Sequence, residues 1–141
     1  MPKTTLNSKQ PKKVLIVEDE GELCLLLNIL LADKNIDLDH VKTLKGAEEY
    51  LQTEKPDLMI LDNKLPDGLG IDFITLHGKN YPSVKVLMIS GYHSAEIKDV
   101  ALEAGADMFL EKPFSKEQIS NAVHELLDTK ETVKSTVDVG E

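Results

Sequence analysis

The chain has 141 residues, a hydrophobic fraction of 41% and a net charge of −9, which suits one globular domain with its own core. No apolar run is long enough to cross a bilayer, and the polar, basic start lacks the apolar region of a signal peptide. All 16 basic residues are lysines and only 4% of residues are aromatic, which argues against direct nucleic-acid binding. The single cysteine, Cys24, cannot form an internal disulfide. Together these features favour a cytoplasmic protein.

Apolar runs predict five β-strands, which are Lys13–Val17, Asp37–Val41, Asp57–Leu61, Lys85–Ser90 and Met108–Glu111. The first, third and fourth runs are almost continuously apolar, which is typical of central parallel strands covered on both faces. The second run is short and mixed, as expected of an edge strand.

Helical spacing of apolar residues fills the gaps between these runs, in the segments 23–31, 47–51, 71–74, 97–104 and 119–127. Gly105 is expected to end the fourth helix, and Ser115 with Gln118 forms a capping box at the start of the fifth. The strict alternation predicts an α/β fold of (βα)5 type, a doubly wound five-stranded parallel sheet with helices on both faces. We expect this domain to span residues 13–128, between a flexible basic tail (1–12) and a flexible polar tail (129–141).

Polar residues lie at the ends of four of the predicted strands. Glu18 and Asp19 follow the first strand, Asp62 the third and Lys112 the fifth, whereas Ser90 ends the fourth. Ligands of open α/β sheets bind beyond the carboxyl ends of the strands, so these groups are expected to converge at one edge.

Three carboxylates cannot lie close together without a counter-charge, and an oxygen-only ligand set suits Mg²⁺. Zinc would require His or Cys ligands at this edge, and neither is found there. The histidines are scattered without ligand spacing, and we interpret them as surface residues: His40, His77, His93 and His124.

An ionised carboxylate beside a metal, a hydroxyl and a lysine has the chemistry of a phosphoryl acceptor. The carboxylate needs no general base, and the cations neutralise the charge that develops on the transferred group. The short Gly-x-Gly in "DGLG" lacks the rest of a dinucleotide pattern, so no cofactor besides Mg²⁺ is expected.

The stretches "VLIVEDE", "DLMILDNKLPDGLG", "VLMISGY" and "EAGADMFLEKPF", with the last amphipathic helix, resemble the receiver domain of two-component response regulators, the CheY-like superfamily. The resemblance covers roughly Lys13 to Leu127. It implies the flavodoxin-like strand order 2-1-3-4-5. It also implies a signalling protein of a phosphorelay rather than a conventional enzyme, although phosphorylation from a small phosphodonor and autodephosphorylation are expected.

The resemblance assigns roles to individual residues. Asp62 is the implied phosphoacceptor, which becomes 4-aspartylphosphate by transfer from a sensor histidine kinase or a phosphotransfer protein. Asp19 would bind Mg²⁺ directly and Glu18 through water, while Asp62 would contribute a side-chain oxygen and Lys64 its backbone carbonyl.

Ser90 and Lys112 would bind the phosphoryl oxygens, and the Lys112–Pro113 bond is expected to be cis. Ser90 and Phe109 are the implied switch residues. Lys64 and Tyr92 occupy positions that tune the lifetime of the phosphoryl group in this family.

The implied output surface comprises the fourth helix, the fifth strand and the fifth helix, through which the domain would control a protein partner. We expect neither nucleic acid nor membrane as a direct partner, and a monomer or a phosphorylation-dependent homodimer. The chain is either a stand-alone receiver or a domain cut from a longer protein.

Three other functions share parts of this pattern. One is a receiver-like binding module that is never phosphorylated. A second is an aspartyl-phosphate phosphatase of the haloacid dehalogenase type, but Lys64 stands where that enzyme needs a second Asp. A flavin carrier of flavodoxin type is disfavoured because the loop "EDEGEL" is acidic where the flavin phosphate would bind.

Overall fold

The computed structural model describes residues 10–32, 35–91 and 95–139, with the side chains of residues 95 and 129–139 left out. Five strands form one parallel sheet in the order β2-β1-β3-β6-β7. Their bounds are β1 Lys12–Val17, β2 Ile36–Val41, β3 Leu58–Asp62, β6 Lys85–Ser90 and β7 Met108–Glu111. Numbered among themselves, these strands have the predicted order 2-1-3-4-5, and β2 lies at the edge as expected.

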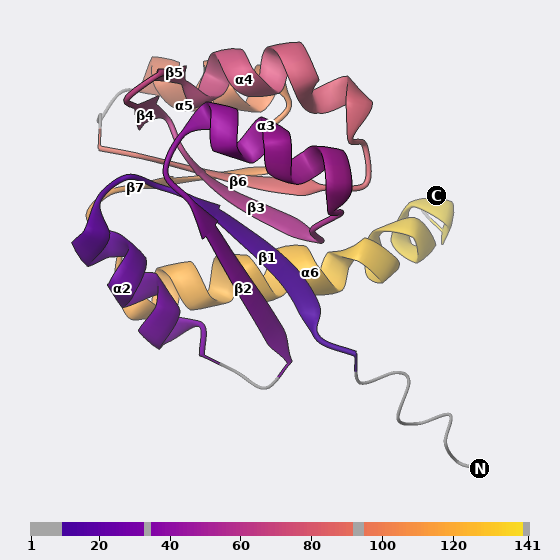
Figure 1. Ribbon diagram of the computed structural model, residues 1–141. Helices are drawn as coiled ribbons and strands as arrows, with labels where there is room; N and C mark the ends of the chain where they lie inside the picture. Colours follow the sequence, from indigo (N-terminus) through magenta and orange to yellow (C-terminus); the bar gives the residue numbers. More distant parts are fainter. Residues whose placement is uncertain (1–9, 33–34, 92–94, 140–141) are drawn as a thin grey trace.

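Five α-helices connect and cover the strands in the described part of the chain. Their bounds are α2 Gly21–Leu30, α3 Leu44–Thr53, α4 Gly70–His77, α5 Ala95–Ala104 and α6 Lys116–Val139. Helices α2 and α6 cover one face of the sheet, and α3, α4 and α5 cover the other (Figure 1). This arrangement confirms the predicted doubly wound fold.

Alternate residues of the central strands enter two separate hydrophobic cores. On β3, Leu58 and Ile60 face the core beneath α2 and α6, whereas Met59 and Leu61 face the core beneath α3, α4 and α5. All four side chains are buried, since a parallel strand between two helical layers has no solvent face. Burying a side chain of this size stabilises the fold by about 1.5–3 kcal/mol.

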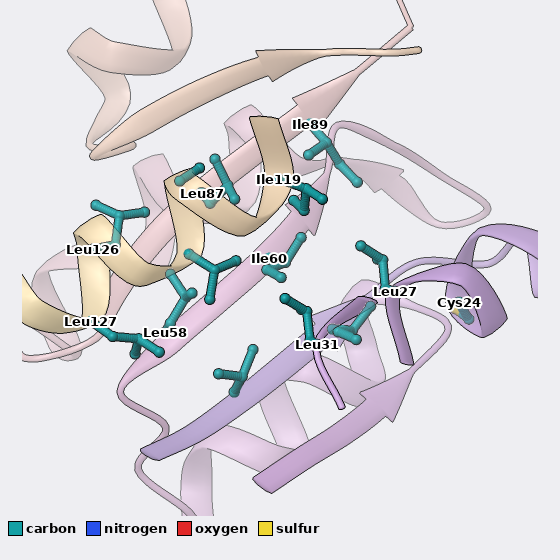
Figure 2. Packing of buried hydrophobic residues seen from close by; sticks show 14 residues of the cluster. Cys24, Leu27, Leu31, Leu58, Ile60, Leu87, Ile89, Ile119, Leu126 and Leu127 are labelled. Carbon is teal, nitrogen blue, oxygen red and sulfur yellow. The ribbon is translucent and has the colours of Figure 1, made fainter. Parts of the chain in front are cut away.

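The core beneath α2 and α6 is shown in close-up in Figure 2. Leu27 from α2 and Ile119 from α6 both lie near Ile60 of β3, and Ile89 lies further along the sheet toward its carboxyl edge. The two helices therefore share one hydrophobic surface, and this surface fixes the loops that leave β1 and β7.

Two predicted helix boundaries are confirmed. Gly105 follows the last residue of α5 with φ +126°, a backbone angle that favours glycine. Ser115 and Gln118 form the reciprocal capping box, because the Gln118 amide donates to Ser115 Oγ (3.0 Å) and the Ser115 amide donates to Gln118 Oε1 (2.8 Å).

The first strand and the last helix extend beyond their predicted bounds. Strand β1 starts at Lys12, one residue earlier than expected, and residues 1–9 of the N-terminal tail lie outside the described residues. Helix α6 does not end at residue 128 but continues to Val139, and its last turns extend beyond the sheet (Figure 1). The apolar stripe ends near Leu127, but a helix can continue past it because its backbone hydrogen bonds are local.

A short hairpin after β3 was not predicted. Strand β4 (Lys64–Leu65) pairs with β5 (Gly68–Leu69) in antiparallel fashion, and α4 is followed by a 3-10 turn, η1 (Gly78–Asn80). Two-residue strands are too short to produce a periodic pattern, so no pattern in the sequence indicates them. Across the described residues, no helix is both long and apolar enough to cross a membrane.

Candidate functional site

The polar residues predicted at the strand ends lie at the carboxyl edge of the sheet. Glu18 directly follows β1, Lys112 directly follows β7, and Asp62 and Ser90 are the last residues of β3 and β6. The Glu18, Asp62 and Ser90 side chains are buried, and Lys112 is half-buried. The parallel register of the strands is therefore what brings residues from four distant parts of the chain together.

Three carboxylates form a compact cluster at this edge. Glu18, Asp19 and Asp62 each offer a carboxylate oxygen, and these oxygens all lie within 4.8 Å of one another. Glu18 and Asp62 are buried, whereas Asp19 is exposed and leaves the cluster open to solvent on one side. Carboxylate oxygens with access to water are the ligands that Mg²⁺ prefers.

Lys112 supplies the positive charge next to the cluster. Its Nζ lies 3.4 Å from Asp62 Oδ2, 3.5 Å from Glu18 Oε1 and 3.7 Å from Glu20 Oε1. One ammonium group thus faces three carboxylates and cannot neutralise them all. The site keeps a net negative charge, as a cation-binding site requires.

Burial dominates the electrostatics of the two inner carboxyl groups. It raises the pKa of Glu18 to about 7, and the nearby charge of Asp62 adds to this increase. Burial also raises the pKa of Asp62, although Lys112 opposes the change. Burial by itself lowers the pKa of Lys112, but the surrounding carboxylates outweigh it, so that this pKa is raised overall.

Glu18 has one oxygen without a hydrogen-bond partner. Its Oε2 accepts a hydrogen bond from the Glu20 amide (3.0 Å), but within the described residues no group donates to its fully buried Oε1. A buried carboxylate oxygen without a hydrogen-bond donor is costly, and Lys112 Nζ at 3.5 Å compensates it only in part, so a bound cation would stabilise it further. The residues present therefore fit a divalent metal ion.

Backbone contacts fix the position of Glu18. Its amide donates to the carbonyl of Val41 on β2 (3.1 Å), and its own carbonyl accepts a hydrogen bond from His40 Nε2 (2.8 Å). The same His40 nitrogen lies 2.8 Å from Cys24 Sγ, and burial raises the pKa of this thiol to about 11. His40 is exposed, as expected of a surface residue, but it also holds the backbone of Glu18 in place, which its isolated position in the sequence does not reveal.

The chain after Asp62 is held in place by Asn63, a buried residue that sequence reasoning missed. The Asn63 amide donates to the carbonyl of Ile89 (2.9 Å), and its carbonyl accepts from the Gly70 amide (2.7 Å). Asn63 Oδ1 accepts from the Ile71 amide (3.0 Å). The backbone amide of Lys64 donates to Asp62 Oδ1 (3.5 Å), so Lys64 lies beside the carboxylate as expected, while its role as a metal ligand stays a prediction.

The two predicted switch residues lie on neighbouring strands. The Ser90 carbonyl accepts a hydrogen bond from the Lys112 amide (2.8 Å), and the Lys112–Pro113 bond is cis, as the resemblance implied. Phe109 is half-buried against the core beneath α3, α4 and α5, and it is aligned with Met88 of β6. Tyr92, expected to tune the phosphoryl lifetime, lies outside the described residues.

Comparison with known proteins identifies the domain. A family described as the response regulator receiver domain matches residues 14–124. The chain is 39% identical over 102 residues to the response regulator protein PilR of Pseudomonas aeruginosa. The matched region is 72% of this chain and 23% of PilR. It is 41% identical over 101 residues to the KDP operon transcriptional regulatory protein KdpE of Escherichia coli. The matched region is 72% of this chain and 44% of KdpE. The chain thus spans less than half the length of either relative.

Solved structures lead to the same result. The signal receiver domain of a LuxO repressor protein from Vibrio parahaemolyticus superposes with a TM-score of 0.81 at 30% identity, over 90% of this chain and 97% of that domain. A CheY-like response regulator receiver domain from Methanospirillum hungatei gives a TM-score of 0.81 at 28% identity, over 87% and 98% of the two chains. The match to the family over most of the sequence, together with the shared fold, shows that this chain belongs to the response regulator receiver family.

Proposed function

We propose that this domain accepts a phosphoryl group on Asp62 from the phosphohistidine of a sensor histidine kinase or a phosphotransfer protein. Receiver domains are signalling domains and not conventional enzymes, and they are Mg²⁺-dependent in general. The observation that carries the proposal is the buried Asp62 carboxylate, which lies 3.4 Å from Lys112 Nζ and within a cluster of three carboxylates.

Asp62 would act as the nucleophile. One of its carboxylate oxygens forms the new bond to phosphorus while the phosphorus–nitrogen bond to the donor imidazole breaks, and the leaving nitrogen keeps the electron pair of that bond and takes up a proton from solvent. Lys112 and the Ser90 hydroxyl would bind oxygens of the transferred group. Because Lys112 already lies close to Asp62 and is held by surrounding carboxylates, little rearrangement is needed to stabilise the added charge.

Glu18, Asp19, the Asp62 side chain and the Lys64 carbonyl would hold the Mg²⁺ ion. When bound, the ion supplies positive charge that neutralises the carboxylates and the phosphoryl oxygens. The buried Oε1 of Glu18, which accepts no hydrogen bond from the described residues, supports this assignment independently of the family.

Phosphorylation would then change the surface formed by α5, β7 and α6. Ser90 would turn toward the phosphoryl group, and Phe109 would pack into the space beside it, next to α5. On that surface Val100 is 47% exposed, which suits contact with a downstream protein or with a second copy of the domain. We propose a protein, and no nucleic acid, as the direct partner of this domain.

Phosphorylation with acetyl phosphate tests the proposal. Wild-type protein incubated with this small donor and Mg²⁺ should gain one phosphoryl group, measured as intact mass, and removal of the metal by a chelator should prevent the gain. Asp62→Asn should gain none, because the amide is a poor nucleophile. Asp72→Asn, which alters an exposed carboxylate in the first turn of α4, is the matched control and should be labelled like wild type.

Two results would contradict the assignment. Equal labelling of wild type and Asp62→Asn would show that the phosphoryl group is bound elsewhere. A folded wild-type protein that binds Mg²⁺ but takes no phosphoryl group from acetyl phosphate or from a phosphohistidine donor would instead support the alternative of a receiver-like binding module.

A further inference from the structure

The segment that follows Asp62 is attached to two helices at two separate points. At its base, the buried Asn63 binds the first amides of α4, those of Gly70 (2.7 Å) and Ile71 (3.0 Å). From there the chain runs through the β4–β5 hairpin, whose tip is formed by residues 66–67, and returns to α4. The base of the hairpin is therefore fixed by contacts that are close in sequence.

The tip of the hairpin is fixed by Asp67, an exposed residue. Both oxygens of its carboxylate accept hydrogen bonds from the start of α3, with Oδ1 bonded to the Leu44 amide (2.9 Å) and Oδ2 to the Lys45 amide (3.0 Å). Helix α3 already has its own cap, since Thr43 Oγ1 accepts from the Gly46 amide (2.9 Å). Asp67 thus satisfies two further amides at the start of α3, and in doing so it joins two elements more than twenty residues apart.

The hairpin also touches the phosphoacceptor. Lys64, the first residue of β4, is paired with Leu69 of β5, and its amide donates to Asp62 Oδ1 (3.5 Å). Next to the tip, Gly68 at the start of β5 (φ +150°) packs so closely on α3 that a Cβ there would lie 3.1 Å from Leu44 Cδ1. A continuous path of contacts therefore connects α3, through Asp67 and the hairpin, to the Asp62 carboxylate.

We propose that Asp67 is a positioning residue for the Asp62 site, because it holds the hairpin against α3 and thereby fixes the Lys64 backbone beside the Asp62 carboxylate. This inference rests on the proposed function to the extent that Asp62 and Lys64 are metal ligands. A hairpin with two-residue strands has little stability of its own. Without Asp67 the tip would therefore separate from α3, and Lys64 would occupy a range of positions. Groups that orient metal ligands typically change metal affinity when they are removed.

Magnesium titration of the full chain by calorimetry tests this role without any phosphorylation step. Asp67→Ala removes both acceptor oxygens, and we expect its Mg²⁺ dissociation constant to rise by roughly tenfold, the lower end of the effects seen for orienting groups. Asp67→Asn loses the same charge but keeps one acceptor oxygen, so its dissociation constant should rise less. Thr43→Ala, the matched control, removes the cap of α3 but not the attachment of the hairpin, and its dissociation constant should equal that of wild type.

These variants separate positioning from charge and from general stability. Equal dissociation constants for Asp67→Ala and wild type would overturn the proposal. If the Mg²⁺ dissociation constant rises equally in Asp67→Ala and Asp67→Asn, the proposal is overturned as well, since loss of the charge would then explain the whole effect. An increase in Thr43→Ala as large as that in Asp67→Ala would show that any weakening of α3 is sufficient, which also contradicts a specific role.

A second measurement keeps this inference separate from the proposed function. If wild type itself binds no Mg²⁺, the metal part of the proposed function fails. The attachment of the hairpin to α3 by Asp67 can then still be tested by hydrogen exchange of the Lys64 amide in metal-free protein. We expect faster exchange in Asp67→Ala than in wild type, and wild-type exchange in Thr43→Ala. An unchanged exchange rate of the Lys64 amide in Asp67→Ala would show that Asp67 does not fix the Lys64 backbone.

Discussion

At the scale of single residues, the site depends on a close approach between the phosphoacceptor strand and α4. A Cβ atom on Gly70 would lie 2.7 Å from the carbonyl oxygen of Asp62 and 3.2 Å from the Asn63 Cα. These contacts are with backbone atoms, which cannot rotate away as a flexible side chain can. Glycine at position 70 is therefore required by space, at the point where α4 starts against the strand end.

Gly70→Ala should consequently destabilise the fold by about 1–3 kcal/mol, the usual cost of adding a methyl group to a closely packed position. Chemical denaturation with urea measures this change. Gly21→Ala is the control, because a Cβ at the start of α2 meets nothing within 4 Å, and it should leave the stability unchanged or slightly increased. Equal stabilities of wild type and Gly70→Ala would show that the strand end yields to the added methyl group.

Sequence reasoning found the charged residues of the site but missed the residues that hold them. Asp62 and Lys112 could be predicted because each lies at the end of an apolar run, and the topology of parallel strands brings such ends together. His40 and Asn63 follow no such rule, since their contacts with Glu18 and with Ile71 depend on the conformations of loops. No periodic pattern encodes these conformations.

At the scale of elements, one side-chain hydrogen bond joins the edge strand to its neighbouring helix. The hydroxyl of Tyr50 on α3 donates to Asp39 Oδ2 on β2 (2.6 Å), and the ring packs on the core beneath α3, α4 and α5. Burial raises the pKa of Tyr50, and the bond to Asp39 raises it further. Strand β2 has only one strand neighbour, and this bond links it in addition to α3.

Tyr50→Phe should destabilise the protein by about 1 kcal/mol at neutral pH, since it removes a hydrogen bond to a partly exposed charged acceptor. The difference from wild type depends on pH in a definite direction. Because the pKa of Tyr50 is higher in the folded than in the unfolded protein, its contribution is complete below about pH 10, the unfolded value, and is lost as the pH rises toward the folded value. The stability gap between wild type and Tyr50→Phe should therefore shrink above pH 10.

Denaturation of both proteins at pH 8 and at pH 10.5 measures this gap. The lysine residues also titrate in this range, but they do so in both proteins and cancel in the difference. A gap that widens with pH would contradict the bond between neutral Tyr50 and ionised Asp39.

The elements themselves were predictable in proportion to their length and periodicity. Strands β6 and β7 have the predicted bounds, β1 and β2 each begin one residue earlier than predicted, and β3 is shifted by one residue at both ends. The hairpin β4–β5 escaped prediction because its two-residue strands carry no period, and α6 was cut short because its last turns lack an apolar stripe. Patterns of hydrophobicity report burial, so they miss elements whose stability comes from other contacts.

At the scale of the whole molecule, the fold places a group of mutually repelling carboxylates at the edge of its own core. Burial of Glu18 and Asp62 works against the stability of the metal-free domain, because both carboxyl groups lose water and the Lys112 ammonium and the amides of Glu20 and Lys64 compensate this loss only in part. The hydrophobic cores on the two faces of the sheet hold these groups together in spite of this repulsion. The domain is thus expected to gain stability whenever a cation occupies the site.

Magnesium should therefore raise the melting temperature of the wild-type protein in a concentration-dependent manner. A ligand that binds only the folded state stabilises it by about 2.7 kcal/mol at a free concentration of 100 times its dissociation constant.

Asp19→Asn should abolish most of this increase in melting temperature, because it removes a charged ligand from the cluster. Asp19 is exposed, so the variant should fold normally, and without Mg²⁺ it should be at least as stable as wild type because it has one repelling charge fewer. Glu22→Gln, an exposed residue in the first turn of α2, controls for the loss of a nearby charge and should keep the wild-type response. An equal Mg²⁺-dependent increase in wild type and Asp19→Asn would place the stabilising cation elsewhere on this acidic protein.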